Sequence, residues 1–314
     1  MTVSQLHVLL DDARGHADTP RDVIVRLARA DSLYGVPNYA AAVPAYDAVV
    51  AAAPARWSGY SRVVEALQLC LTSTDQNERS ITLARAALPR LGVSGPAMNV
   101  AAAGLESAVA LPETSRVRMP ALAEMEAATH RLVTDFTFTV AADDRSGAWI
   151  ALLDARHDAN DSLGVRRVAA CWSTFLDGEA AAAQTPEERT VFDSHRLSAY
   201  MELDQPERAI PMLEQSQKDF PGDYNPPYRL AIAYRALHRW DAALVAAARA
   251  DSMMYGPRKL NLYDVRTDVY LGRGDPAAAK RSLEDAIKYA EGLPEEQRSA
   301  GRIAGYRKRL AAMR

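Results

Sequence analysis

The chain has 314 residues, of which 48% are hydrophobic and 25% charged, the balance of a soluble globular protein and not of a disordered one. Its net charge of -3 is small for this length and lacks the concentrated positive charge that nucleic-acid binding requires. No stretch approaches the roughly 18 apolar residues of a membrane helix, and no signal-peptide pattern opens the chain, so we expect no membrane partner and a cytoplasmic location.

The first predicted helix pair spans residues 22–55. Ala42 falls where two antiparallel helices would touch, Tyr46 lies one turn later, and Pro54 follows the second helix. Asn38 is a suitable cap for that second helix. This spacing predicts one helix–turn–helix repeat.

The next part of the chain, from about 57 to 184, contains helices without a visible repeat. Apolar residues recur there every three and four positions, which indicates amphipathic helices. We interpret them as three longer and degenerate helix pairs. The six stretches are 57–72, 76–91, 94–111, 117–134, 144–159 and 162–182.

One segment inside this part departs from the helical pattern. Phe136, Phe138 and Val140 alternate with threonines, a period of two that is typical of extended backbone. We therefore predict an extended connector at 135–143 with its aromatic side chains held in a groove. It would separate N-terminal helical repeats in 1–134 from C-terminal repeats in 144–314.

The C-terminal part carries the clearest internal repeat. Three residue types recur in one order with a period of 34 to 37 residues, which is the length of a helix–turn–helix repeat. The recurring residues are Tyr200, Tyr234 and Tyr270; Ala209, Ala243 and Ala279; and Pro221, Pro257 and Pro294.

Capping signals agree with this register. Thr185-Pro186-Glu187-Glu188 has the form of a capping box, and Asp204 precedes Glu207 in the same way. Asn225-Pro226 predicts another helix start, and Gly274-Asp275-Pro276 predicts a helix end followed by a cap and a new start. A basic stretch at 297–312 is predicted to be a terminal capping helix.

These patterns resemble the tetratricopeptide repeat (TPR) family, clearly over 187–294 and also over 22–55. The resemblance implies an all-α fold, a right-handed α-solenoid of about seven antiparallel helix pairs with a terminal capping helix. Residues 192–259, with Asp223-Tyr224-Asn225-Pro226-Pro227, also resemble the TPR tail of bacterial proteins that carry a thioredoxin-like domain. No CxxC motif occurs in this chain, so no redox activity is inferred.

Candidate catalytic and metal-binding motifs all have simpler explanations. Asp193, Ser194 and His195 are consecutive on a predicted helix, where neighbouring side chains point apart and cannot form a triad. Asp158 begins an imperfect calcium-loop pattern that we interpret as a turn between helices. Cys70 and Cys171 are expected to be buried thiols. We therefore predict no catalytic residue, no metal site and no cofactor.

The resemblance also implies which residues face a ligand. In the family, set positions of the first helix of each repeat line a concave groove that holds an extended peptide. Ser194 and Ser198 replace the Lys and Asn with which the family's best-defined groove clamps a terminal carboxylate, so that clamp is expected to be absent. The predicted peptide-binding residues are Ser194, Ser198, Asn225, Tyr228, Arg235, Asn261, Asp264 and Asp268.

The predicted function is that of a non-catalytic scaffold or adaptor that binds a protein or peptide partner. Two alternatives remain open at this stage. The array could mediate self-association or support a separate functional domain. It could also enclose a pocket in which two carboxylates act as an acid/base pair.

Overall fold

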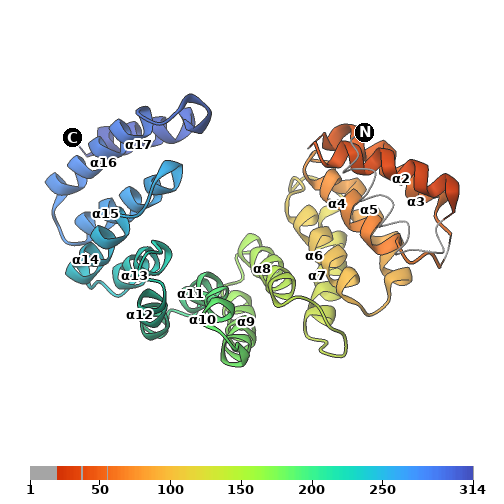
Figure 1. The fold of residues 1–314 in the computed structure, drawn as a ribbon, viewed down its shortest axis with the longest axis horizontal. Helices are drawn as coiled ribbons and strands as arrows, with labels where there is room; N and C mark the ends of the chain where they lie inside the picture. The colour runs from red at the N-terminus through yellow and green to blue at the C-terminus, as the bar shows by residue number, and fades with distance from the viewer. Residues whose placement is uncertain (1–19, 37, 55, 314) are drawn as a thin grey trace. The chain divides into compact units, whose positions relative to one another are not determined.

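The computed structural model describes residues 20–36, 38–54 and 56–313, and these are helical without any strand. In chain order the described helices form seven successive couples, each of two neighbouring helices joined by a turn or loop, followed by a single terminal helix, as predicted (Figure 1). The couples are α2 (Arg21–Tyr34) with α3 (Tyr39–Ala52), α4 (Tyr60–Thr72) with α5 (Asn77–Leu91), α6 (Gly95–Val109) with α7 (Arg118–Val133), α8 (Ala142–Asp158) with α9 (Ser162–Ala182), α11 (Asp193–Glu202) with α12 (Ala209–Asp219), α13 (Asn225–Ala236) with α14 (Trp240–Asp251), and α15 (Lys259–Gly272) with α16 (Pro276–Glu291). The short α10 (Pro186–Thr190) precedes α11, and α17 (Ala300–Ala312) ends the series.

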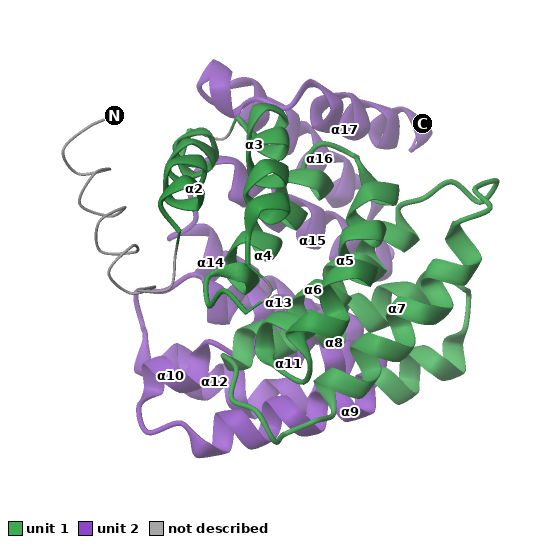
Figure 2. Cartoon of the chain, turned by 90° about the vertical axis from the view of Figure 1, so that its right-hand side faces the viewer, with its two compact units in different colours: residues 1–168 green, residues 169–314 purple. Residues whose placement is uncertain are grey.

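The chain divides into two compact units, residues 1–168 and 169–314 (Figure 2). The division falls within α9, C-terminal to the segment 135–143 that the sequence suggested as a boundary. Residues 135–141 are non-helical and belong to unit 1. That residues 135–143 separate the repeats of 1–134 from those of 144–314 stays a prediction.

Unit 1 packs its helices closely because small residues lie where they meet. Gly104 of α6 is buried, and a Cβ atom there would come within 2.8 Å of Met125 Sδ and 3.2 Å of Ala84 Cβ. Any larger side chain would push α5 or α7 away. The sequence shows no repeat at this point, yet the packing requirement is the same as in the clear repeats.

The segment after α7 is held by one buried arginine. Arg145, 4% exposed, donates to the carbonyl oxygens of Val133 at 2.7 Å and Asp135 at 2.9 Å. Its guanidinium lies 4.6 Å from the ring centroid of Phe136 and 5.0 Å from that of Phe138. The prediction that these aromatics are tucked into a groove was wrong for Phe136, which is 66% exposed, because its ring covers the guanidinium instead.

Unit 2 contains the recurring residues at the positions that packing requires. Ala209, Ala243 and Ala279 are fully buried, so the helices of each couple approach closely there. Tyr200 is also buried, and its hydroxyl donates to Asp177 of α9. The main core of this unit joins α11 to α15 through residues that include Leu213.

In most couples the turn between the two helices has the same conformation, even where no repeat is visible in the sequence. Five couples join through a residue with a left-handed backbone, and the next residue's N–H donates to the carbonyl five positions earlier, over 2.8 to 3.0 Å. This is the Schellman helix ending. The left-handed residues are Asp75, Asn160, Asp204, His238 and Gly274. Asp75 and Asn160 lie in the stretch where no sequence period is visible.

The helix caps agree with the sequence in most places. Asn38 accepts from the N–H of Ala41, Thr185 from that of Glu188, and Asp275 from that of Ala278, as predicted. Asp204 is a correction: it is the left-handed turn residue after α11, and the 3-10 turn that leads into α12 begins after Gln205.

The cysteines give a second correction. Cys70 is buried in α4, and burial raises the pKa of its thiol to about 11. Cys171 is exposed on α9, contrary to the expectation of two buried thiols.

Candidate binding face of unit 2

The eight residues predicted to face a ligand all lie in unit 2, on the first helices of three successive couples. Ser194 and Ser198 are on α11, three residues are on α13, and three are on α15. The α13 residues are Asn225, Tyr228 and Arg235, and the α15 residues are Asn261, Asp264 and Asp268.

The three α15 residues are contacted by the terminal helix α17. Arg302 Nη2 lies 2.6 Å from Asn261 Oδ1 and 2.8 Å from Asp264 Oδ2. Arg309 spans both carboxylates, with Nη1 2.9 Å from Asp264 Oδ1 and Nη2 2.8 Å from Asp268 Oδ1. Each contact is a hydrogen bond from an ionised guanidinium group.

A fourth predicted residue joins this network from α13. Arg235 Nη1 lies 2.6 Å from Asp268 Oδ2, so Asp268 is shared between α13 and α17. The structure thus brings Arg235, Asn261, Asp264 and Asp268 together on one polar face.

Two tyrosines border the same network. Tyr306 of α17 is 3% exposed, and its hydroxyl lies 3.1 Å from both Leu260 O and Asp264 Oδ2. Burial raises the pKa of Tyr306 to about 12. Burial also raises the pKa of Tyr228, while the charge of Arg235 opposes the rise. Tyr228 lies seven residues before Arg235 on α13 and packs, half-buried, against the core of unit 2.

The α17 side of this face was not predicted from the sequence. Arg302, Tyr306 and Arg309 follow one another at spacings of four and three, which puts them on one side of a helix. That spacing was the available signal, but the segment was interpreted only as a terminal cap.

The remaining predicted residues are not drawn into the network. Asn225 donates to Asp223 Oδ1 at 2.8 Å, a local contact at the start of α13. Ser194 is half-buried and Ser198 is exposed on α11. The predicted site is thus divided between an α13–α15 cluster and a separate pair of serines.

Beside those serines lies a buried carboxyl that the sequence did not single out as a structural feature. Asp193 is 1% exposed, and neither carboxyl oxygen has a hydrogen-bond partner. Burial raises the pKa of Asp193, while the nearby Ser216 hydroxyl, which falls outside hydrogen-bond geometry, and the charge of Arg229 oppose the shift. Burial likewise lowers the pKa of Arg229, which the charge of Asp193 opposes. Both groups are therefore poorly solvated, and each charge favours the ionised form of the other.

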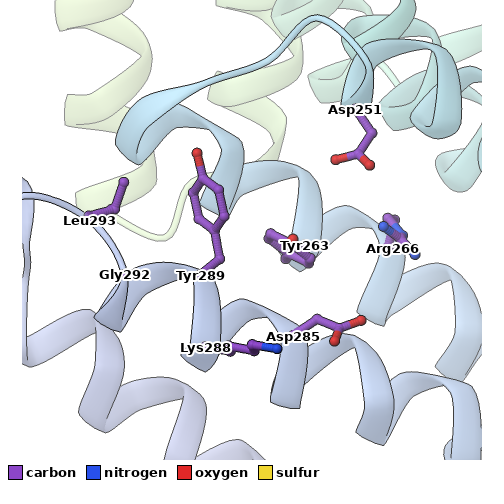
Figure 3. Close-up of a pocket in the computed structure, with 8 residues that line it drawn as sticks. All are labelled: Asp251, Tyr263, Arg266, Asp285, Lys288, Tyr289, Gly292 and Leu293. Atoms are coloured by element: carbon purple, nitrogen blue, oxygen red, sulfur yellow. The ribbon is translucent and has the colours of Figure 1, made fainter.

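A pocket of unit 2 lies between α14, α15 and α16 (Figure 3). This pocket of about 680 Å³ has two tyrosines in its wall, Tyr263 and Tyr289, whose ring centroids are 5.8 Å apart. Charged residues of both signs line it as well: Asp251, Arg266, Asp285 and Lys288. Asp251 Oδ1 is already 2.9 Å from Lys259 Nζ, so that carboxylate is paired within the fold.

The motifs set aside in the sequence have structural explanations. Asp158 accepts two hydrogen bonds of 2.6 Å from Arg118 Nη2 and ends α8 at a helix–helix turn. The ring of His195 packs 5.8 Å from that of Trp172. Within the described residues no group of three or more His, Cys, Asp or Glu side chains is placed to hold a metal ion. None of the described helices has the length and apolar character to span a bilayer.

Comparison of the sequence with models of known protein families gave no match, and comparison with curated protein sequences gave none either. Solved structures do match the fold. A tetratricopeptide repeat protein from Parabacteroides merdae superimposes with a TM-score of 0.58 at 9% identity, covering 94% of this chain and 99% of that one. The chain therefore has the fold of a TPR protein, an all-α array of helix pairs.

Two further structures match with lower TM-scores. BtubC from P. vanneervenii gives 0.41 at 16% identity, covering 72% of this chain and 83% of that one. The TPR2AB domain of yeast Sti1, solved as a complex with an Hsp90 peptide, gives 0.34 at 14% identity, covering 92% of this chain and 98% of that one.

Proposed function

We propose that this protein is a non-catalytic binding module that holds a segment of a protein partner along the first helices of unit 2. The observation that carries the proposal is the convergence of Arg235, Asp264 and Asp268 from two successive couples on one polar face. Tyr228 lies seven residues before Arg235 on α13, which puts it on the same side of that helix. Hydrogen-bonding groups repeated from helix to helix suit a peptide segment, whose own polar groups recur along its length.

The carboxylates of this face are poorly suited to acid/base catalysis. Asp264 is bound by Arg302 and Arg309, and Asp268 by Arg235 and Arg309. An acid/base pair needs two carboxyl groups in environments that separate their pKa values, whereas Asp264 and Asp268 share the same kind of arginine partners. Recognition of charge and shape fits them better than proton transfer does.

The test uses a phage-displayed library of random peptides, selected on the wild-type protein. The affinity of each enriched peptide is then measured by fluorescence anisotropy for wild type and for Tyr228→Ala. We expect the substitution to weaken binding about tenfold or more, since aromatic anchors dominate interface energies. Tyr255→Ala is the matched control, because Tyr255 is 79% exposed and lies between α14 and α15, outside the predicted positions.

Circular dichroism would establish that both variants keep the helical content of wild type. Failure to enrich any peptide, or equal affinities for wild type and a folded Tyr228→Ala variant, would contradict the proposal. In that case self-association becomes the better reading of the array.

A further inference from the structure

One side of α15 carries two carboxylates and one amide in a row, which we call the acidic ladder. Asn261, Asp264 and Asp268 are separated by three and four residues, so they lie above one another on the same face of the helix. All three stand at positions predicted to face a ligand. A ligand for this ladder must therefore present cationic hydrogen-bond donors at a matching helical spacing.

The terminal helix α17 presents such donors. Arg302, Tyr306 and Arg309 form a row on α17 that meets the ladder group for group, at distances of 2.6 to 3.1 Å. The helix α17 covers a cluster that includes Leu260 and Leu283 with its apolar residues Ile303 and Leu310. Its polar row is instead directed at the ligand-facing positions.

The attachment of α17 is modest by the standard of the other helices. Tyr306 is its one buried residue among those the structure describes, and Ile303 and Leu310 are only half-buried. The ion pairs with Asp264 and Asp268 are partly exposed to water, where each contributes little. The link 294–299 that leads into α17 is exposed along its whole length.

We propose that α17 is an internal ligand that covers the acidic ladder of α15 and is displaced from it by a partner. The partner is a helical segment with arginine, an aromatic residue and arginine at the spacing of Arg302, Tyr306 and Arg309. This inference rests on the proposed function and names both the class of partner and its regulation. The alternative occupant is α17 of a second copy of the chain.

The experiment uses a fluorescein-labelled synthetic peptide of residues 299–313 as the probe. Its affinity is measured by anisotropy for the full-length wild type and for a full-length Arg302→Ala/Arg309→Ala variant. In wild type the tethered helix competes at a high effective concentration. We expect the variant, in which that competition is weakened, to bind the peptide about tenfold tighter or more.

Two matched variants test the mechanism. Arg307→Ala/Lys308→Ala removes two cations from the exposed side of α17, where Arg307 pairs with Glu291, and should bind the peptide as wild type does. Adding Asp264→Asn and Asp268→Asn to the Arg302→Ala/Arg309→Ala chain should abolish the gain. All chains would first be shown by circular dichroism to be folded.

A folded Arg302→Ala/Arg309→Ala variant that binds no better than wild type overturns the inference, and so does a gain that survives loss of both carboxylates. Light scattering tests the alternative occupant. If wild type is a dimer and the Arg302→Ala/Arg309→Ala variant is a monomer, the acidic ladder binds α17 of a second copy, and the proposal of a separate partner is wrong. The probe needs no external partner. If it fails while library peptides still bind through Tyr228, the inference falls and the proposed function stands.

Discussion

Arg235 in α13 pairs with Asp268 in α15 over 2.6 Å although 33 residues separate them in the sequence. The separation is close to one repeat, so successive couples place their first helices side by side and bring the two side chains together. Asp268 uses its other oxygen for Arg309 of α17. One carboxylate thereby links three elements of unit 2.

The Arg235–Asp268 pair should show measurable coupling. Because both side chains are partly exposed, a double-mutant cycle with Arg235→Ala and Asp268→Ala should give a coupling free energy of about 0.5–1 kcal/mol, decreasing as salt is added. Urea unfolding followed by circular dichroism measures it. Arg273 and Asp241 form the control pair at a similar separation of 32 residues, and since Asp241 is 86% exposed their coupling should be smaller. Equal coupling in both pairs would contradict this account.

Asp193 should destabilise the protein at neutral pH. Burial raises its folded pKa, so the folded state holds the proton more tightly than the unfolded state. Stability therefore falls as pH rises from the ordinary aspartate range through the raised folded pKa, and stays reduced above it. Asp193→Asn should raise Tm at pH 7 by roughly 2–4 °C, with the difference disappearing at acidic pH. Thermal melts across pH 3 to 8 test this.

Asp177→Asn is the control for Asp193→Asn, because it removes the same charge from a satisfied site. Asp177 accepts from Arg196 and Arg208, each at 2.8 Å, and from the Tyr200 hydroxyl. Its neutralisation should lower Tm. A loss of stability in both variants would show that Asp193 is stabilised by contacts in the folded state.

Gly274 should be required by its backbone conformation. Its φ of +80° lies in the left-handed region that residues with a Cβ atom disfavour. A Cβ atom there would meet no other atom, so Gly274→Ala isolates the backbone effect and should cost about 1 kcal/mol in the free energy of unfolding. Gly301→Ala is the control, since Gly301 is helical and also has open space around its Cβ position. A neutral Gly274→Ala variant would refute the argument.

The two thiols should differ in reactivity. Cys171 is exposed, whereas Cys70 is buried and its pKa is raised to about 11. Since the thiolate is the reactive species, Ellman's reagent at pH 8 should modify Cys171 quickly and Cys70 only after unfolding. Mass spectrometry of the modified protein identifies the site. Rapid modification of Cys70 in the native protein would contradict its placement.

The sequence alone determined the fold class and much of the C-terminal half. Ala209, Ala243 and Ala279 are small because paired helices touch there, and the caps at Thr185 and Asp275 follow from unpaired N–H groups at helix starts. These are local requirements, so they leave a trace in neighbouring residues. In the middle of the chain Gly104 meets the requirement for close packing, and left-handed residues such as Asp75 meet that for a helix-ending turn. The spacing of tyrosines and prolines indicates neither of them.

Only the tertiary structure decided what the polar residues contact. The family resemblance predicted that Asp264 and Asp268 face a ligand, but their partners Arg302 and Arg309 lie 38 to 45 residues away in the sequence. The sequence also led us to expect a buried Cys171, which is exposed in the structure. Helical periodicity does not show which face of a helix the neighbouring helices leave uncovered. Periodicity fixes a residue's direction from its own helix axis. The identity of the side chain it meets depends on how separate helices pack, which is a property of the folded chain.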